Sequence, residues 1–229
     1  LFFRLGDFYE MFFEDAKLAS EELDLTLTGR DCGQDERAPM CGVPFHSCEG
    51  YIARLVEKGY KVAICEQMED PASAKGLVKR DVVRIITPGT VIEDSMLKED
   101  RNNYLATIYF SKDAAALCFA DASTGEAKVT EISGDDALER AVNEVIRFSA
   151  SELLLTKEDR LKLDPLLNGR YGGTVTERED VCFSPSDTEE MLCKNFGVLS
   201  LENLNIKSGS AAHSALGAAI GYMRENGRA

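Results

Sequence analysis

The first stretch of the chain begins with a dense apolar run, which a helix-like pattern of apolar residues follows. Residues 1–5 are almost entirely apolar, which is typical of a short strand. After Gly6, apolar residues recur three or four positions apart, as on one face of a helix: Phe8, Met11, Phe12, Ala16, Ala19 and Leu23. Asp7 stands where an N-cap would stand, and Glu10 follows three residues later as in a capping box. Gly6 permits a tight turn before it. The pattern therefore predicts a strand, a sharp turn and a capped helix.

The remainder of the first hundred residues continues this mixture of elements. Predicted strands cover 25–29, 61–67 and 82–87, and a predicted helix runs from Ser47 to Lys58. A short helical turn is expected from Asp70-Pro71. The residues 99–103 are charged and polar, as in a linker. We predict a small mixed α/β domain over 1–100.

A different order of elements follows the linker. Strands are predicted at 104–110, 115–121 and 126–132, and the turn Ser123-Thr124-Gly125 joins the second to the third. Helices at 135–148, from 157, at 187–195 and at 210–225 then alternate with strands at 152–156 and 174–177. Three strands followed by alternating helices and strands is the order of a ribonuclease H-like domain, here predicted over 104–229. The fold class is α/β (mixed), with two domains.

Composition agrees with a globular protein. Of 229 residues, 44% are hydrophobic and 29% charged. No apolar run reaches the length of a membrane span, and no secretory signal is present. Seven cysteines without a secretion signal favour a reducing, cytoplasmic compartment. The cluster between Cys41 and Cys48 lacks the spacing of a zinc site, so no metal is expected. Because the chain begins at Leu1, we expect it to be part of a longer protein.

The charge does not suggest a plain electrostatic DNA binder. The formal net charge is −14, and both halves of the chain are acidic. The best basic cluster in the sequence comprises Lys75, Lys79, Arg80 and Arg84. Any contact with DNA must therefore be local or be helped by parts of the protein outside this chain.

Four motifs carry a resemblance to a known family. They are Gly6-Asp7-Phe8-Tyr9-Glu10; Pro39–His46; Val62–Gln67 with the following Asp70-Pro71; and Val82–Thr90. In this order and spacing they resemble the MutS family of DNA mismatch repair proteins. The resemblance covers residues 1–100 with high specificity, and extends more loosely over 101–229, which looks like the family's connector domain.

The resemblance implies roles for individual residues. Phe8 matches the aromatic that stacks on a mispaired or unpaired base while the DNA is kinked, and Glu10 matches the residue that hydrogen-bonds that base. Gly6 would be a structural turn, and Asp7 would lie close to the DNA. A last group is expected around the same groove, as phosphate or sugar contacts or as ordinary solvated surface: Arg30, Met40, Lys79 and Arg80.

The resemblance also implies what lies outside this chain. No G-x-x-x-x-G-K-[ST] phosphate loop is present, so we expect no enzyme activity and no cofactor here. ATP and Mg would bind in the C-terminal part of the intact protein. Expected partners are duplex DNA with mismatches or small loops, MutL (with the helix 187–195 as a candidate surface), and a second copy held through C-terminal regions. The expected location is the bacterial cytoplasm, near the nucleoid, with no membrane.

Three other interpretations remain open from the sequence. Phe8 and Glu10 could be helix core and cap alone. Asp121, with Glu126 nearby, could bind metal in a ribonuclease H-like nuclease, or could simply be a turn residue. The chain could also be a protein-interaction fragment that leaves DNA contact to other domains. This last interpretation predicts that Phe8 is buried.

Overall fold

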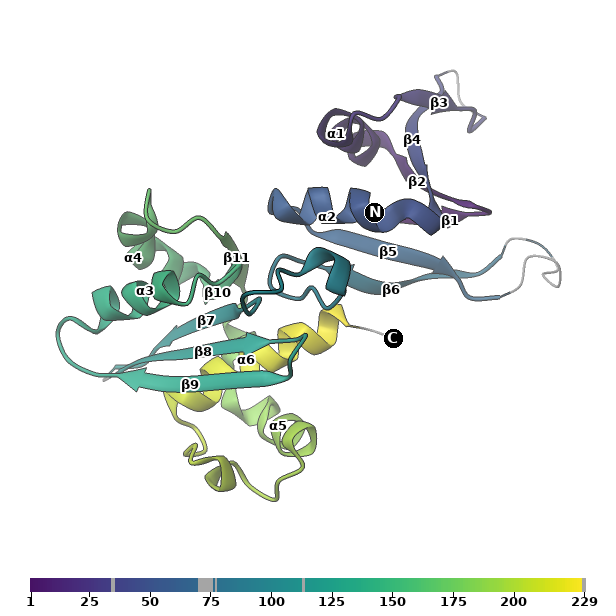
Figure 1. The fold of residues 1–229 in the computed structure, drawn as a ribbon. Coiled ribbons are helices and arrows are strands. Elements are labelled where there is room, and N and C mark those ends of the chain that lie inside the picture. The colour runs from purple at the N-terminus through teal and green to yellow at the C-terminus, as the bar shows by residue number, and fades with distance from the viewer. Residues whose placement is uncertain (34–35, 70–75, 77, 113, 228–229) are drawn as a thin grey trace. The chain divides into compact units, whose positions relative to one another are not determined.

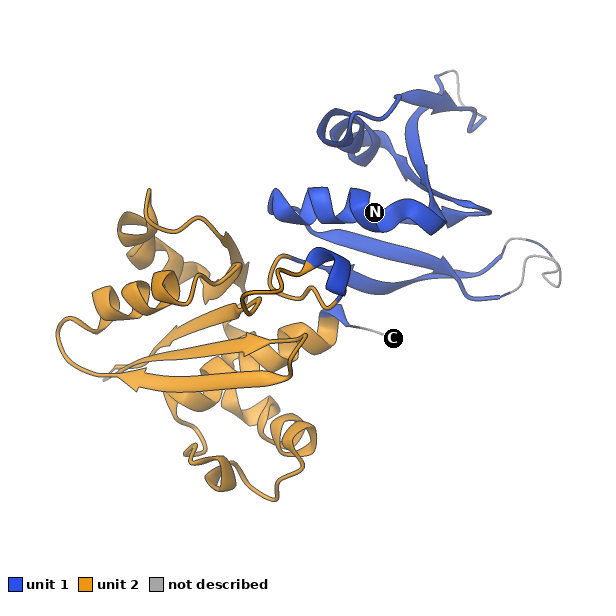
Figure 2. Ribbon diagram, viewed as in Figure 1, with its two compact units in different colours: residues 1–87, 93–96, 226–229 blue, residues 88–92, 97–225 orange. Residues whose placement is uncertain are grey.

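The computed structural model describes residues 1–33, 36–69, 76, 78–112 and 114–227. The chain divides into two compact units (Figure 2): unit 1 comprises residues 1–87, 93–96 and 226–229, and unit 2 comprises 88–92 and 97–225. Each unit is built on a sheet of its own, which confirms the mixed α/β class. The turn expected at Asp70-Pro71 and the cationic Lys75 lie outside the described residues.

Unit 1 is a six-stranded sheet with two helices (Figure 1). Its elements are β1 (Phe2–Leu5), β2 (Phe8–Phe12), α1 (Phe13–Leu23), β3 (Thr28–Arg30), β4 (Ala38–Pro44), η1 (Phe45–Ser47), α2 (Cys48–Glu57), β5 (Val62–Gln67), β6 (Arg80–Ile86) and η2 (Asp94–Met96). The strand order is β3-β4-β2-β1-β5-β6. Neighbouring strands are antiparallel except β1 and β5, which are parallel.

The predicted helix from Asp7 is wrong in its first turn and a half. Residues 8–12 form β2, which pairs with β1 and β4, and the helix α1 begins only at Phe13. Asp7 is therefore not an N-cap, and Glu10 is not the partner of a capping box. The junction is marked by Phe13, whose φ of 53° is left-handed, an uncommon conformation for a bulky residue.

The two helices of unit 1 cover one face of its sheet. Side chains alternate across a strand, so residues 9 and 11 of β2 point to the opposite face from 8, 10 and 12. Tyr9 and Met11 are buried together with their β4 partners Val43 and Cys41. The Cys41 thiol donates to the carbonyl oxygen of Ala16 in α1, 3.4 Å away. The apolar faces of α1 and α2 complete this core.

Unit 2 has a five-stranded sheet with helices on both faces. Its elements are β7 (Leu105–Phe110), β8 (Ala115–Asp121), β9 (Glu126–Ile132), α3 (Ala137–Arg147), β10 (Glu152–Thr156), α4 (Lys157–Leu167), β11 (Thr174–Arg178), η3 (Asp180–Phe183), η4 (Pro185–Asp187), α5 (Glu189–Phe196), η5 (Leu201–Leu204) and α6 (Ala211–Asn226). The strand order is β11-β10-β7-β8-β9. β7, β8 and β9 form the predicted antiparallel meander, and β10 and β11 run parallel to β7.

Two separate cores hold unit 2 together. One lies between the sheet and α3 with α4, and centres on residues such as Ile108, Val142 and Leu163. The other lies on the opposite face against α5 and α6, and includes Leu154 and Leu192. Within the described part of the chain, no helix is long and apolar enough to cross a membrane.

Candidate nucleic-acid interface

A two-residue hairpin loop presents the predicted site. Leu5 pairs with Phe8, so Gly6 and Asp7 alone connect β1 to β2. Gly6 has a φ of 59°, and a left-handed first position filled by glycine is the pattern of a type II′ turn, whose twist suits a hairpin. The loop is fastened from the side, since the Phe45 N–H donates to the Asp7 carbonyl at 3.0 Å. Gly6 is thus the structural turn that the sequence predicted, in a hairpin and not before a helix.

The face of the sheet that α1 and α2 leave uncovered carries three of the predicted site residues, Phe8, Glu10 and Met40. Directly paired residues of neighbouring strands point to the same side. The rows through β1, β2 and β4 therefore define what we call the open face: Phe3, Leu5, Phe8, Glu10, Phe12, Met40, Gly42 and Pro44. None of these eight residues is buried within the structure, whereas their neighbours Phe2, Tyr9, Met11, Cys41 and Val43 are.

Strand geometry puts Phe8 and Glu10 on one surface. In a helix, residues two apart would point about 200° away from each other, whereas in a strand they point the same way. Phe8 lies at the turn end of the open face, with 46% of its surface exposed. This exposure contradicts both the prediction that Phe8 is core and the burial expected of a pure interaction fragment. An aromatic ring this exposed beside a fixed turn can enter a stack of bases.

Glu10 is held by a cation on the same face. The Arg30 Nη1 donates to Glu10 Oε2 at 2.5 Å, and the Arg30 guanidinium lies 6.0 Å from the Phe12 ring centre. Arg30 stands at the end of β3, opposite Ala38 of β4, so its side chain crosses the row of Met40 and Phe12 to reach Glu10. Gly42 lies directly opposite Glu10, and a Cβ there would come within 3.5 Å of the Glu10 Cγ. That distance is ordinary van der Waals contact, and the tightest contact of such a Cβ would be with the Tyr9 carbonyl oxygen, 3.1 Å away.

The reverse side of the hairpin is braced by residues that sequence analysis did not single out. The Tyr9 hydroxyl donates to Glu66, and burial together with this hydrogen bond raises the pKa of Tyr9 above its ordinary value. Arg4 donates from Nε to the Gly6 carbonyl at 2.5 Å and lies 3.4 Å from the centre of the Phe45 ring. The hairpin itself had a signal in the sequence, because a two-residue loop with Gly in its first position between two strand-like runs is typical of a hairpin.

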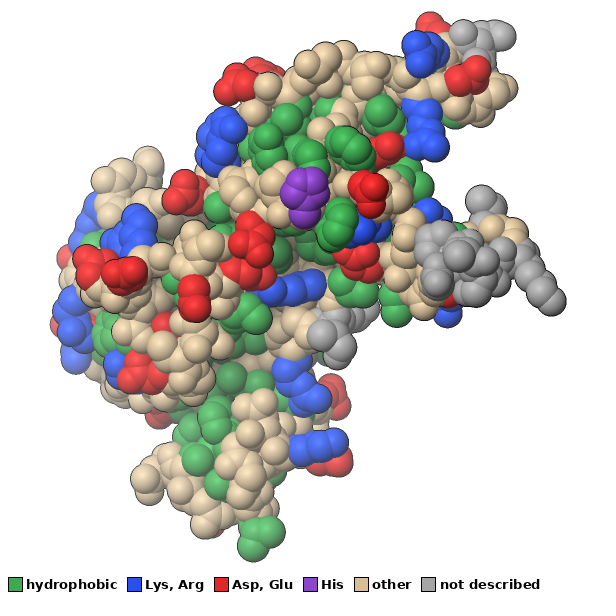
Figure 3. Space-filling view, turned by 45° about the vertical axis from the view of Figure 1, so that its right-hand side comes forward, with side chains coloured by type: hydrophobic (Ala, Val, Ile, Leu, Met, Phe, Trp, Pro, Cys, Tyr) green, Lys and Arg blue, Asp and Glu red, His purple; other side chains and the backbone are tan. Residues whose placement is uncertain are grey.

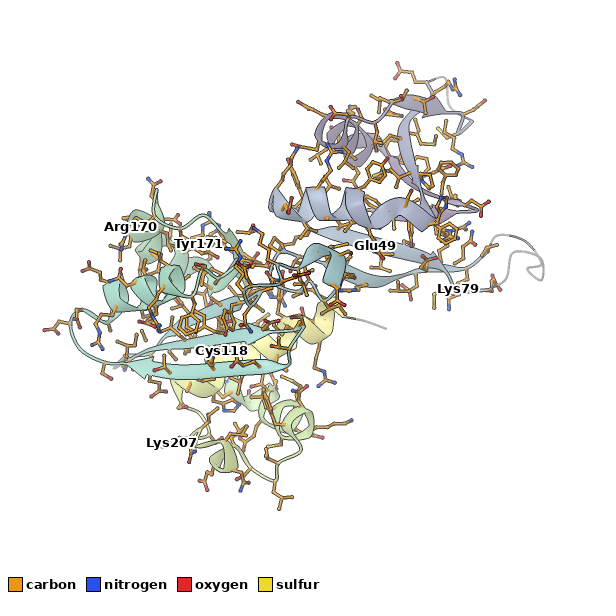
Figure 4. The ribbon with its side chains drawn as sticks, viewed as in Figure 1. Glu49, Lys79, Cys118, Arg170, Tyr171 and Lys207 are labelled. Atoms are coloured by element: carbon orange, nitrogen blue, oxygen red, sulfur yellow. The ribbon has the colours of Figure 1, made fainter. Side chains whose placement is uncertain are left out.

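The other predicted cations are less available than their sequence suggests. Arg80 donates to the Arg4 carbonyl at 2.8 Å and lies over the Phe3 ring of the open face, 5.2 Å from its centre. Arg84 is paired with Glu93. Lys79 is exposed but precedes β6, so strand pairing does not bring it to the open face (Figure 4). Acidic and basic side chains are interspersed over the surface seen in Figure 3.

Asp121 in unit 2 has the environment of a turn residue. Its carboxylate accepts from the N–H and hydroxyl of Ser123, from the Asn102 amide and from the Asn103 N–H, at 2.6–3.1 Å. Burial raises the pKa of the Asp121 carboxyl, but these hydrogen bonds outweigh it, and the pKa lies below its ordinary value. Among the described residues, no cluster of three or more potential metal ligands occurs. The geometry therefore favours the turn and gives the nuclease interpretation no support.

Comparison with known proteins gives matches along nearly the whole chain. The sequence profile of MutS domain I matches residues 1–95, and that of MutS domain II matches residues 103–228. The DNA mismatch repair protein MutS of Ruminiclostridium cellulolyticum is 47% identical over 225 residues, 97% of this chain. That of Acetivibrio thermocellus is 60% identical over 158 residues, 69% of the chain, and that of Clostridium tetani 48% over 210 residues, 92% of the chain. The chain spans about a quarter of the length of these relatives, from 18% to 25%.

Proposed function

The chain belongs to the MutS family of DNA mismatch repair proteins, and on this premise we propose that unit 1 recognises mispaired or unpaired bases with Phe8 as a wedge. The observation that carries the proposal is the half-exposed Phe8 ring at a rigid hairpin turn, with Glu10 two residues along on the same face. Duplex DNA would meet the open face, kinked at the point where the ring enters.

The energetics of a wedge explain how it would discriminate. Stacking of a base on an aromatic side chain contributes about 1–3 kcal/mol. Unstacking a base step costs a few kcal/mol, and least where the pairing is already defective. The two quantities are close in size, so insertion is unfavourable in sound duplex and near neutral or favourable at a mismatch. Phe8 thereby converts weak pairing into binding free energy.

Glu10 would add a second criterion. A carboxylate near phosphates is unfavourable unless it accepts a hydrogen bond from a base N–H or carries a proton itself. A mispaired base exposes such a donor, whereas paired bases use theirs within the duplex. Glu10 should therefore penalise matched duplex more than it strengthens binding to a mismatch.

We assign the supporting roles in the same proposal. Met40 and Arg80 would contact sugar or phosphate along the open face, and Asp7 would lie at the edge of the kink. Lys79 would make a phosphate contact from outside the open face. Unit 2 would act as the connector, with α5 as a candidate surface for MutL. ATP with Mg and the homodimer interface would belong to the rest of the intact protein, in the bacterial cytoplasm.

The test compares two duplexes in the intact protein. We expect Phe8→Ala to reduce the preference for a duplex with one G·T mismatch over the matched duplex by roughly 5- to 150-fold, which corresponds to about 1–3 kcal/mol of lost stacking. Matched-duplex binding should change little. Phe13→Ala is the matched control, because Phe13 is also an exposed aromatic but starts α1 outside the open face. An unchanged preference in Phe8→Ala would refute the wedge.

A further inference from the structure

The Glu10–Arg30 ion pair has a feature that neither residue's role as a DNA contact explains. The two residues come from strands separated by β4, and the cation reaches over the open face to meet the carboxylate. The Glu10 side chain is only 18% exposed, and the Arg30 side chain is 49% exposed. The carboxylate therefore lies close to the sheet, and the cation lies on its solvent side.

This arrangement neutralises the acidic group on the surface that would face DNA. A carboxylate and a phosphate a few ångströms apart repel each other by several times the thermal energy near a protein surface. While Arg30 holds Glu10, an approaching duplex meets a neutral pair. A guanidinium also has five N–H donors, so Arg30 can donate to a phosphate without first leaving Glu10.

We propose that Arg30 is a positioning residue that holds Glu10 out of reach of the bases and releases it only when a mispaired base offers a donor. In matched duplex the pair stays closed, and Arg30 bridges the carboxylate and a phosphate. At a mismatch Glu10 turns to the base, and Arg30 transfers wholly to the phosphate. Arg30 thus sets the penalty that Glu10 imposes on sound duplex. The inference rests on the proposed function and adds a second step to it.

The pair is suited to this exchange because it is weak. Water and salt compete for Arg30, which is half-exposed, so the pair contributes little net stability although Glu10 is only 18% exposed. Opening it for a base N–H and a phosphate oxygen therefore needs only a small gain from each new contact. A buried pair of the same geometry would stay closed in both complexes.

The proposal makes Arg30 and Glu10 interdependent, which a double-mutant cycle measures. In the intact protein, Arg30→Gln should weaken binding to both duplexes, and more so to the matched duplex, because an unneutralised Glu10 then faces the phosphates. The ratio of mismatched to matched affinity should rise about threefold, the size expected of an ion pair with one half-exposed partner. In a Glu10→Gln background, Arg30→Gln should leave the ratio unchanged.

A plain phosphate contact behaves differently. Arg30 would then lower both affinities by the same factor in both backgrounds, reduce the slope of log affinity against log salt by about 0.9, and leave the ratio unchanged. That result overturns the proposal, as does an Arg30→Gln variant that binds both duplexes normally. Arg30→Lys keeps the charge but loses the planar guanidinium with its several N–H donors. It should raise the ratio of mismatched to matched affinity less than Arg30→Gln does.

Two controls distinguish a failure of the positioning role of Arg30 from a failure of the proposed wedge. Lys17→Gln removes the same charge from α1, on the covered side of the sheet, and should leave the ratio unchanged. Phe8→Ala measured in parallel tests the wedge itself. If Phe8→Ala abolishes mismatch preference while Arg30 and Glu10 act additively, the positioning role alone is wrong.

Discussion

The segment 88–92 of unit 2 contains a glycine whose replacement should be strongly destabilising. Gly89 donates its N–H to Glu152 Oε2 at 3.0 Å, and Glu152 is fully buried at the start of β10. The other carboxylate oxygen of Glu152 accepts from the hydroxyls of Thr176 in β11, at 2.6 Å, and Tyr222 in α6, at 2.7 Å. One carboxylate therefore ties the segment to a strand and a helix far away in sequence.

The expected magnitude for Gly89→Ala follows from what its Cβ would meet. That atom would lie 2.8 Å from the Glu152 Cβ and 2.8 Å from the Leu105 Cδ1, closer than real side chains allow. Leu105 is fully buried, and the hydroxyls of Thr176 and Tyr222 hold the Glu152 carboxylate in place. Neither Leu105 nor Glu152 can therefore move freely. Overpacking costs about 1–3 kcal/mol, and displacement weakens a hydrogen bond to a charged group worth about 1.5–3 kcal/mol. We expect a loss of about 2–5 kcal/mol.

Native-state hydrogen exchange on the 229-residue chain measures this loss of stability separately for unit 2 and unit 1. Amides of β7 and β10 report unit 2, whereas amides of β2 and β4 report unit 1 and should keep their protection. Gly221→Ala is the matched control, because Gly221 lies in α6 with open space around its Cβ position. Alanine in a helix should raise the stability of unit 2 by about 0.5–1 kcal/mol. If both variants change stability in the same direction, the steric argument is wrong.

Two further predictions concern a buried histidine and a strained junction. Burial lowers the pKa of His213, against the opposing charge of Glu189, while its Nδ1 accepts from the Gly209 N–H at 3.1 Å. The unfolded chain then binds more protons below about pH 6.5, so unit 2 should lose stability as the pH falls through that value and keep it above. Denaturation of the parent protein at pH 7.5 and 5.5 tests this prediction, and equal stability at both pH values would refute it. His213→Asn keeps an acceptor for the Gly209 N–H and should abolish the pH dependence of stability. Separately, Phe13→Asn should stabilise unit 1 by about 0.5–1 kcal/mol, because asparagine tolerates left-handed φ and the Phe13 side chain is 61% exposed. Phe13→Ala keeps the strain, so an equal gain in that variant would contradict the explanation.

The sequence predicted unit 2 better than unit 1 for a physical reason. Strands buried on both faces are continuous apolar runs, and β8 and β10 were predicted with their observed bounds. The strand β2 is covered on one face only, and its sequence fits two interpretations. Phe8, Met11 and Phe12 fit a helix, while the run from Phe8 to Phe12, in which four of five residues are aromatic or apolar, also fits a short strand. The two-residue Gly-Asp loop resolves the ambiguity in favour of a hairpin, although Asp7 also fits the N-cap of a helix.

The site shows the same division between local and distant information. Phe8 and Glu10 could be selected by their motif, and their shared face follows from strand geometry alone. The Arg30–Glu10 pair could not be found this way, because it depends on β3 pairing with β4 and on β4 lying beside β2. The same holds for Glu152, whose donors come from positions 89, 176 and 222. Contacts across such separations are set by the sheet order, which no local pattern encodes.

The acidity of the chain is compatible with a mismatch sensor. Phosphate contacts add equally to matched and mismatched complexes, so they lengthen the time spent on sound DNA without improving discrimination. On the open face the charge of Arg30 is offset by Glu10, and beside it Arg80 donates to the Arg4 carbonyl. With a net charge of −14, the chain adds little unspecific attraction of its own. In the proposed mechanism, the difference that Phe8 and Glu10 would create between the two duplexes would then be a large share of what unit 1 contributes to binding. Under that condition a wedge worth only about 1–3 kcal/mol could decide the outcome.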